Sequence, residues 1–96
     1  MYLNQDYQQK LHPYFDSFVD HLDSKYRILK WKGLAIISNL SRVDADKRFD
    51  AIFSKYFNLL NSEYMTTVTN VVWNSGTIAL GKPYLVPKIT PELLKV

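Results

Sequence analysis

An internal repeat with a period of 38 residues constrains the fold of this chain more than any other feature. The segment HLDSKY at 21–26 is echoed by LLNSEY at 59–64. Just upstream, six apolar residues in the first copy each meet an apolar residue 38 positions later. They are Leu11, Tyr14, Phe15, Phe18, Val19 and Leu22, matched by Phe49, Ile52, Phe53, Tyr56, Phe57 and Leu60. This agreement indicates one structural unit used twice.

The spacing of the apolar residues predicts helices. Within each copy they recur in steps of three and one, which places them in one stripe along a helix. A second stripe follows Ser24 and Ser62, whose hydroxyls are suited to cap a new helix. These second stripes are Tyr26, Leu29, Gly33, Ile36, Ile37 and Leu40, then Tyr64, Val68, Val71, Val72, Ser75 and Ile78. The β-branched residues of 66–74 also allow a strand, but the repeat favours a helix.

The helix ends and a third copy follow from the same comparison. Asp44 is a plausible cap for the third helix, and Gly81 reads as the end of the fourth. At an offset of 74, the apolar pattern of the first copy begins again at Leu85. Thr90-Pro91-Glu92 then predicts a short helix over 91–96. We therefore expect a single domain over 1–96, with repeat 1 at about 6–43, repeat 2 at about 44–81 and a partial third repeat at 82–96.

The hairpin turns resemble those of HEAT repeats. The turn Asp23-Ser24-Lys25-Tyr26-Arg27 is similar to the Asp-Pro-x-Val-Arg turn of that family, and Leu34 stands where its second helix usually has Leu. Pro13 and Pro87 resemble the proline that often kinks its first helix. The resemblance implies an all-α fold, a right-handed α-α superhelix of about two and a half helical hairpins. It also implies a groove lined by the second helices, which in this family usually binds proteins.

The groove positions can be read from the repeat. The sides of the second helices opposite to the core stripes should face the groove, and both tryptophans lie there. We expect a shallow aromatic patch with polar and cationic neighbours. Its candidate partner-binding residues are Trp31, Lys32, Arg42, Thr69, Asn70 and Trp73. Trp is enriched among residues that dominate binding. The alternative is that both indoles pack against a missing or neighbouring helix.

The composition narrows the function classes. The chain of 96 residues has no cysteine, no signal peptide and no apolar run long enough to span a bilayer, which favours a cytoplasmic protein without membrane contact. No catalytic triad order, phosphate loop or Cys/His set is present, so we expect neither an enzyme nor a cofactor. His12, Asp16 and Asp20 share one helix face, but a solvated polar face is a better interpretation than a metal site.

Three functions remain open. A protein-interaction scaffold requires only the repeat, and we favour it. Nucleic-acid binding, as in HEAT-like DNA alkylation repair glycosylases, is the second: five cations and no acid lie in 25–42, although they ring the helix rather than forming a stripe. Self-association into a homo-oligomer is the third, because so few repeats leave apolar surface open at the ends.

Overall fold

The fold is all-α. The computed structural model describes residues 5–44 and 47–95, and every regular element in these ranges is a helix. The α-helices are α1 Gln5–Leu11, α2 Phe15–His21, α3 Arg27–Leu40, α4 Arg48–Ala51, α5 Phe53–Phe57, α6 Met65–Gly81 and α7 Val86–Leu94. Short 3-10 helices η1 His12–Tyr14, η2 Ser41–Val43, η3 Asn58–Asn61 and η4 Pro83–Leu85 adjoin them. The helix α6 covers all of 66–74, so the strand alternative for that stretch is wrong.

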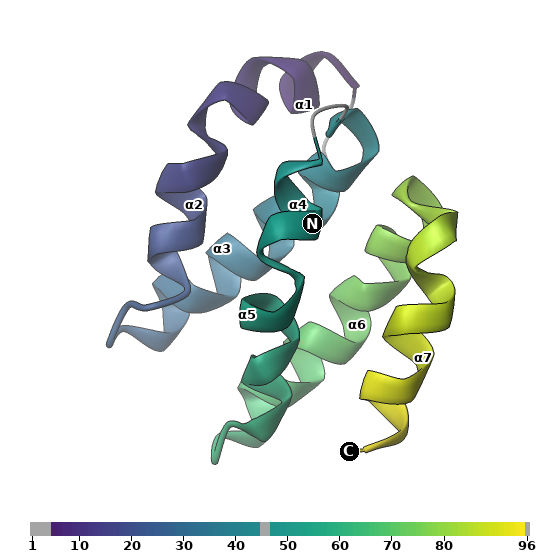
Figure 1. Cartoon of the computed structure of the whole chain (residues 1–96). Helices are drawn as coiled ribbons and strands as arrows, with labels where there is room; N and C mark the ends of the chain where they lie inside the picture. The colour runs from purple at the N-terminus through teal and green to yellow at the C-terminus, as the bar shows by residue number, and fades with distance from the viewer. Residues whose placement is uncertain (1–4, 45–46, 96) are drawn as a thin grey trace.

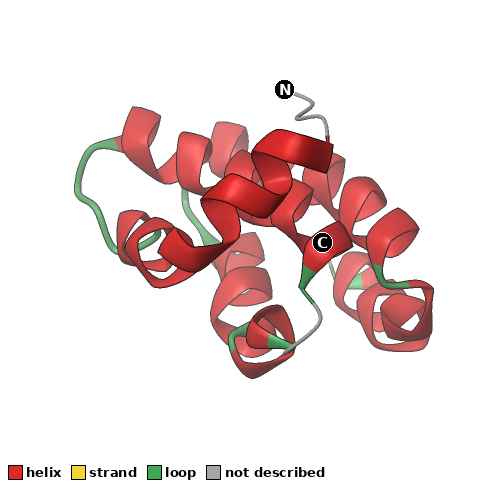
Figure 2. Ribbon diagram, turned by 90° about the horizontal axis from the view of Figure 1, so that it is seen from above, coloured by secondary structure: helices red, strands yellow, loops and turns green. Residues whose placement is uncertain are grey.

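The helices form antiparallel hairpins in two layers. The chain runs down α2 and back along α3, then down α4, α5 and η3 and back along α6 (Figure 1). The helices α3 and α6 lie side by side in one layer, and α2, α5 and α7 lie in the other (Figures 1 and 2). Helix α3 makes its most extensive contacts with α6 and α2. None of the other described helices covers the outward face of α3 and α6.

The two hairpin loops have the same local structure, 38 residues apart. Ser24 Oγ accepts a hydrogen bond from the Tyr26 N–H at 3.0 Å, and Ser62 Oγ accepts one from the Tyr64 N–H at 3.1 Å. Both tyrosines have an extended backbone and directly precede a helix, α3 or α6. Each serine therefore accepts from the residue directly before the helix, and neither α3 nor α6 has a side-chain cap on its own first turn.

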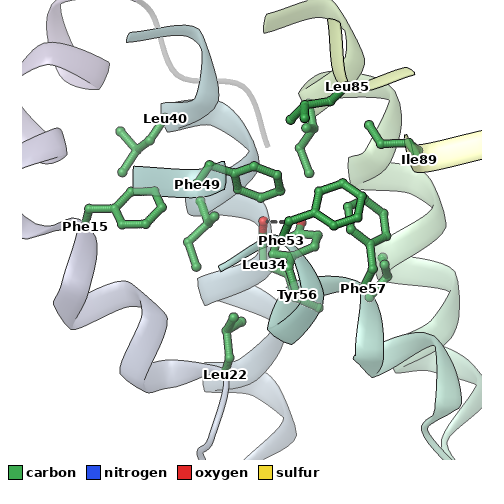
Figure 3. Packing of buried hydrophobic residues seen from close by; sticks show 13 residues of the cluster. Phe15, Leu22, Leu34, Leu40, Phe49, Phe53, Tyr56, Phe57, Leu85 and Ile89 are labelled. Carbon is green, nitrogen blue, oxygen red and sulfur yellow. Dashed lines mark hydrogen bonds between the residues drawn. The ribbon is translucent and has the colours of Figure 1, made fainter. Parts of the chain in front are cut away.

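The core lies between the two layers and is rich in aromatic rings (Figure 3). Phe49 contacts Phe53 and Tyr56 edge-on, with ring centroids 6.3 and 5.3 Å apart. The Tyr56 hydroxyl donates a 2.9 Å hydrogen bond to the Leu34 carbonyl, joining the second hairpin to the first. Burial raises the pKa of Tyr56 above its usual range, so this hydroxyl stays protonated as a donor.

Five residues of the expected stripes are exposed instead. The 3-10 turn at Pro13 breaks the first helix and shifts its phase, which turns Tyr14 outward. Tyr26 and Tyr64 lie outside the helical geometry, so the helical stripe does not extend to them. Leu29 and Val72 lie at the borders of their stripes.

The end of the chain also differs from the expectation. Instead of a short helix over 91–96, α7 begins at Val86 and includes Pro91 in its interior. Pro87 stands in the first turn, where its missing N–H costs nothing, so the helix begins there. Val96 lies outside the described residues. The apolar residues of the partial copy behave as expected, because Leu85 and Ile89 are buried in the core.

The glycines serve different purposes. A Cβ at Gly33 would lie 2.9 Å from the His21 Cβ, so this glycine lets α2 approach α3 closely. A Cβ at Gly81 would lie 3.0 Å from the Arg42 backbone nitrogen, so this glycine lets the end of α6 approach η2. Gly76 lies inside α6, where a glycine can permit close packing, but it has nothing within 4 Å of its Cβ position and is exposed, so it serves no such contact.

Candidate binding face on α3 and α6

The seam between α3 and α6 is held by polar contacts. The Trp31 indole Nε1–H donates a 3.1 Å hydrogen bond to Thr67 Oγ1. About two turns further along, Ser38 Oγ lies 3.2 Å from Asn74 Oδ1. Both contacts join residues 36 positions apart. They hold the two helices at a set register, so that their outward sides form one continuous face.

The α6 half of this face is uncharged and exposes several large apolar side chains among threonines. From Met65 to Gly81 the helix has no charged side chain. Trp73 is 79% exposed, and Met65 and Leu80 are exposed to a similar extent on the same side of the helix. Single exposed apolar residues are ordinary in soluble proteins, whereas several large ones on one helix side make this surface a candidate for binding.

The α3 half contains an apolar hollow near the start of the helix. The hollow has a volume of about 410 Å³ and is open on one side. It is lined by Lys25, Tyr26, Arg27, Ile28 and Trp31. Because the Trp31 N–H is engaged by Thr67, the indole presents its apolar ring atoms here. The hollow is therefore suited to hold a large apolar side chain.

Two cations at this hollow lie over aromatic rings. The Arg27 guanidinium carbon lies 4.5 Å from the centre of the Tyr64 ring, which links the loops of the two hairpins. The Lys25 ammonium lies 5.3 Å from the centre of the Tyr26 ring. Cation–π contacts of this kind orient the charged groups without neutralising them. The rim of the hollow thus carries oriented positive charge.

The structure distributes the six candidate residues unevenly. Trp31 is half-buried and packs against the core, whereas Trp73 is on the surface. Trp31 therefore follows the packed alternative, and Trp73 follows the exposed one. Lys32 and Thr69 are exposed, and the half-buried Asn70 donates from Nδ2 to the Thr66 carbonyl.

Arg42 is the candidate that the structure separates from the hollow. It lies in η2, eleven residues beyond Trp31 and therefore roughly 16 Å along the helix axis. Sequence reasoning placed Ile28 on the groove side but missed Lys25, Tyr26 and Tyr64 as neighbours of the site, because the tyrosines fitted the core stripe. The signal that could have found the tyrosines is the repeated Ser-x-Tyr sequence, in which the serine hydroxyl accepts from the tyrosine N–H and holds that residue before its helix.

A buried ionic network joins the hairpins on the opposite side of the molecule from the hairpin loops. We call Lys82, Asp44, Asp50, Tyr84 and His12 the Lys82 network. The Lys82 ammonium lies 3.1 Å from Asp44 Oδ2 and 2.9 Å from Asp50 Oδ1, and the Lys82 side chain is only 4% exposed. Tyr84 OH donates to Asp50 Oδ2 at 2.9 Å. The pair Asp44 and Lys82 falls 38 residues apart, at the starts of the second and third copies.

Asp44 is fully engaged within this network. Its Oδ1 accepts hydrogen bonds from His12 Nε2 at 2.7 Å and from the Arg48 N–H at 3.0 Å. Its Oδ2 accepts from the Phe49 N–H at 2.7 Å as well as from Lys82. Asp44 therefore caps α4, as expected, and has no free oxygen for a substrate. The network therefore serves as a structural contact between the hairpins.

The charges of the network are mutually stabilised. Burial alone raises the pKa of Asp44, but the hydrogen bonds from His12, the Phe49 N–H, Lys82 and the Arg48 N–H outweigh it and lower the pKa. For Asp50, Lys82 and Tyr84 lower the pKa against the same opposing effect of burial. The pKa of Lys82 is raised by Tyr84, Asp50 and Asp44, although burial alone lowers it.

These shifts predict a loss of stability in acid. A carboxyl whose pKa is lower in the folded state than in the unfolded chain stabilises the fold above the unfolded pKa, about 3.9 for Asp. We expect the free energy of unfolding to fall steadily as the pH drops below about 4. Urea unfolding measured between pH 7 and pH 2 checks this. The Asp44→Asn variant is the control, and a profile as steep as that of the unmodified chain would contradict the assignment.

Comparison with known proteins leaves the chain without an assigned relative. No protein-family model, curated protein or solved structure matches it. Within the described residues, no three His, Cys, Asp or Glu side chains are grouped so as to hold a metal. His12 contacts Asp44 rather than forming such a group with Asp16 and Asp20. Among the described helices, none has the length and apolar character needed to cross a bilayer.

Proposed function

We propose that this chain is a HEAT-like helical repeat module that binds another protein through the outward face of α3 and α6. We call this surface the α3/α6 face and define it by Ile28, Trp31, Met65, Trp73 and Leu80. The proposal includes a right-handed superhelical stacking of the hairpins. The 38-residue period and the equivalent hairpin loops support it.

The observation that carries the proposal is the exposure of Trp73 on an uncharged helix. An indole that is 79% exposed leaves a large apolar area in water, with no energetic benefit to the isolated fold. Met65 and Leu80 extend this area along α6, and Ile28 extends the α3 side. A partner that covers these side chains gains their burial, and Trp is the residue type most enriched among binding hot spots.

We expect Trp73→Ala to abolish most partner binding without changing stability. Truncating a hot-spot tryptophan weakens binding by about 2 kcal/mol, roughly a thirtyfold rise in the dissociation constant. Peptides selected on the unmodified chain from a displayed library of random 16-residue sequences provide the ligand. Binding of each selected peptide to the variant is measured by fluorescence anisotropy, and folding is checked by thermal unfolding.

The matched control is Tyr14→Ala. Tyr14 is also an exposed aromatic residue, but it lies in η1, which belongs to the other layer. This variant should bind the selected peptides as the unmodified chain does. If Trp73→Ala keeps full affinity for every selected peptide, or if the two variants lose affinity equally, the α3/α6 face is not the binding surface.

A further inference from the structure

We infer that the partner of the α3/α6 face is an acidic protein segment that also carries large apolar side chains. This inference rests on the proposed function and specifies the chemistry of the partner. It starts from the charges of the second-helix layer. No Asp or Glu lies between Asp23 and Asp44, or between Glu63 and Glu92. All of α3, η2 and α6 is therefore free of acidic side chains.

Several exposed cations on α3 and in the loop before it form no ion pair within the described residues. The exposed Lys55 pairs with Asp23 at 2.6 Å, and the buried Lys82 pairs with Asp44 and Asp50. In contrast, neither Arg27 nor Lys32 forms an ion pair with any residue in the described ranges, and the same holds for Lys25. Lys55, Lys82 and Lys95 thus have acidic partners, whereas the cations around the apolar hollow keep their positive charge uncompensated by an ion pair in the described residues.

Apolar surface and positive charge alternate over a short distance. The hollow between Ile28 and Trp31 can hold an apolar side chain, and Lys25 and Arg27 line the same hollow. The Arg27 guanidinium, held over Tyr64, still has N–H groups at its edge for a carboxylate. A segment with apolar side chains on one side and carboxylates beside them matches both features. Docking of an amphipathic segment into a groove is a common mode of peptide recognition.

The same charges match a nucleic acid less well. A phosphate backbone requires cations along its whole path, because each neutralised phosphate contributes to the affinity. The cations lie on α3 and its flanking residues, whereas α6 contributes none from Met65 to Gly81. A strand that stacked a base on Trp73 would cross an uncharged helix. The geometry therefore favours carboxylates near α3 and apolar anchors over α6.

The test uses the full chain and the displayed library of random 16-residue peptides. We expect selected peptides to be enriched in Asp and Glu together with Phe, Trp, Leu or Ile. Their dissociation constants should rise about tenfold in the variant Arg27→Gln/Lys32→Gln, and their affinity should fall as salt is added. The variant Lys10→Gln/Lys95→Gln removes the same charge from exposed positions outside this face and should leave the affinity within about twofold. Lys32→Gln alone provides a weaker version of the effect in case the double variant is unstable.

Three results overturn the inference, and they are distinguishable. Selected peptides that depend on Trp73 but lack acidic residues overturn the charge assignment and leave the binding face intact. Failure to obtain any peptide that depends on Trp73 overturns both proposals. Tighter binding of a fluorescent 20-nucleotide oligothymidine than of the selected peptides, with competition between the two, assigns the face to nucleic acid instead.

Discussion

Replacing Lys82 by methionine should cost about 3–5 kcal/mol of folding free energy. Methionine preserves most of the buried apolar stem but removes the charge. The side chain of Asp44 is fully buried, so the variant leaves a carboxylate without its cation in the protein interior. Asp50 and Tyr84 lose their shared partner as well. For a domain of this size the loss corresponds to a fall of roughly 12 °C or more in the melting temperature.

The matched control for this prediction is Lys55→Met. Lys55 also forms a short ion pair, at 2.6 Å from Asp23, but both side chains are exposed to solvent. Such pairs contribute about 0–1 kcal/mol. Urea unfolding of the two variants at pH 7 gives the comparison. Equal effects of the two substitutions would show that the Lys82 network does not hold the hairpins together.

Replacing a glycine by alanine should lower the stability of the fold at two positions and raise it at the third. Gly33→Ala and Gly81→Ala place a Cβ against backbone atoms of α2 and η2, and we expect each to cost about 1–3 kcal/mol. Gly76→Ala meets no neighbour and should stabilise the chain by about 0.5–1 kcal/mol, through the higher helix propensity of alanine.

Chemical unfolding of the three glycine variants checks this ordering. All three glycines lie in α-helices with ordinary negative φ angles, so backbone strain does not distinguish them. The difference in stability between the variants therefore reports how closely the helices pack at each glycine. If Gly33→Ala and Gly81→Ala were as stable as Gly76→Ala, α2 would not pack closely on α3, nor the end of α6 on η2.

The sequence predicts the helices of this chain well, because their apolar periodicity repeats. The apolar stripes that begin at Leu11 and Phe49 lie on helical segments and contribute to the core. Helix α6 forms despite its β-branched residues. The repeat carried this information where local propensity did not. The errors lie where helices begin or break, since periodicity does not report the direction of a side chain there, and at the borders of the stripes, as at Leu29 and Val72. Tyr26 and Tyr64 are the clearest cases.

The candidate site was predicted in part. Helical periodicity placed both tryptophans on the outward sides of α3 and α6, but it could not determine their burial. Trp31 is drawn into the seam by its hydrogen bond to Thr67, whereas no such hydrogen bond forms at Trp73 within the described residues. The Lys82 network was not predicted at all. A lysine between a glycine and a proline is typical of an exposed loop in sequence. Asp44 and Asp50 are distant in sequence and come close to Lys82 only in the folded structure.

The most direct test of the central claim is to map a selected peptide onto the chain by ¹H–¹⁵N NMR. The account predicts that the Trp73 indole N–H and the outward backbone amides of α6 shift on titration, together with the amides around the hollow at Ile28. The amides of α2 and α5 should remain in place. Shifts concentrated on α2 and α5, with the Trp73 indole unchanged, would contradict a binding face on α3 and α6.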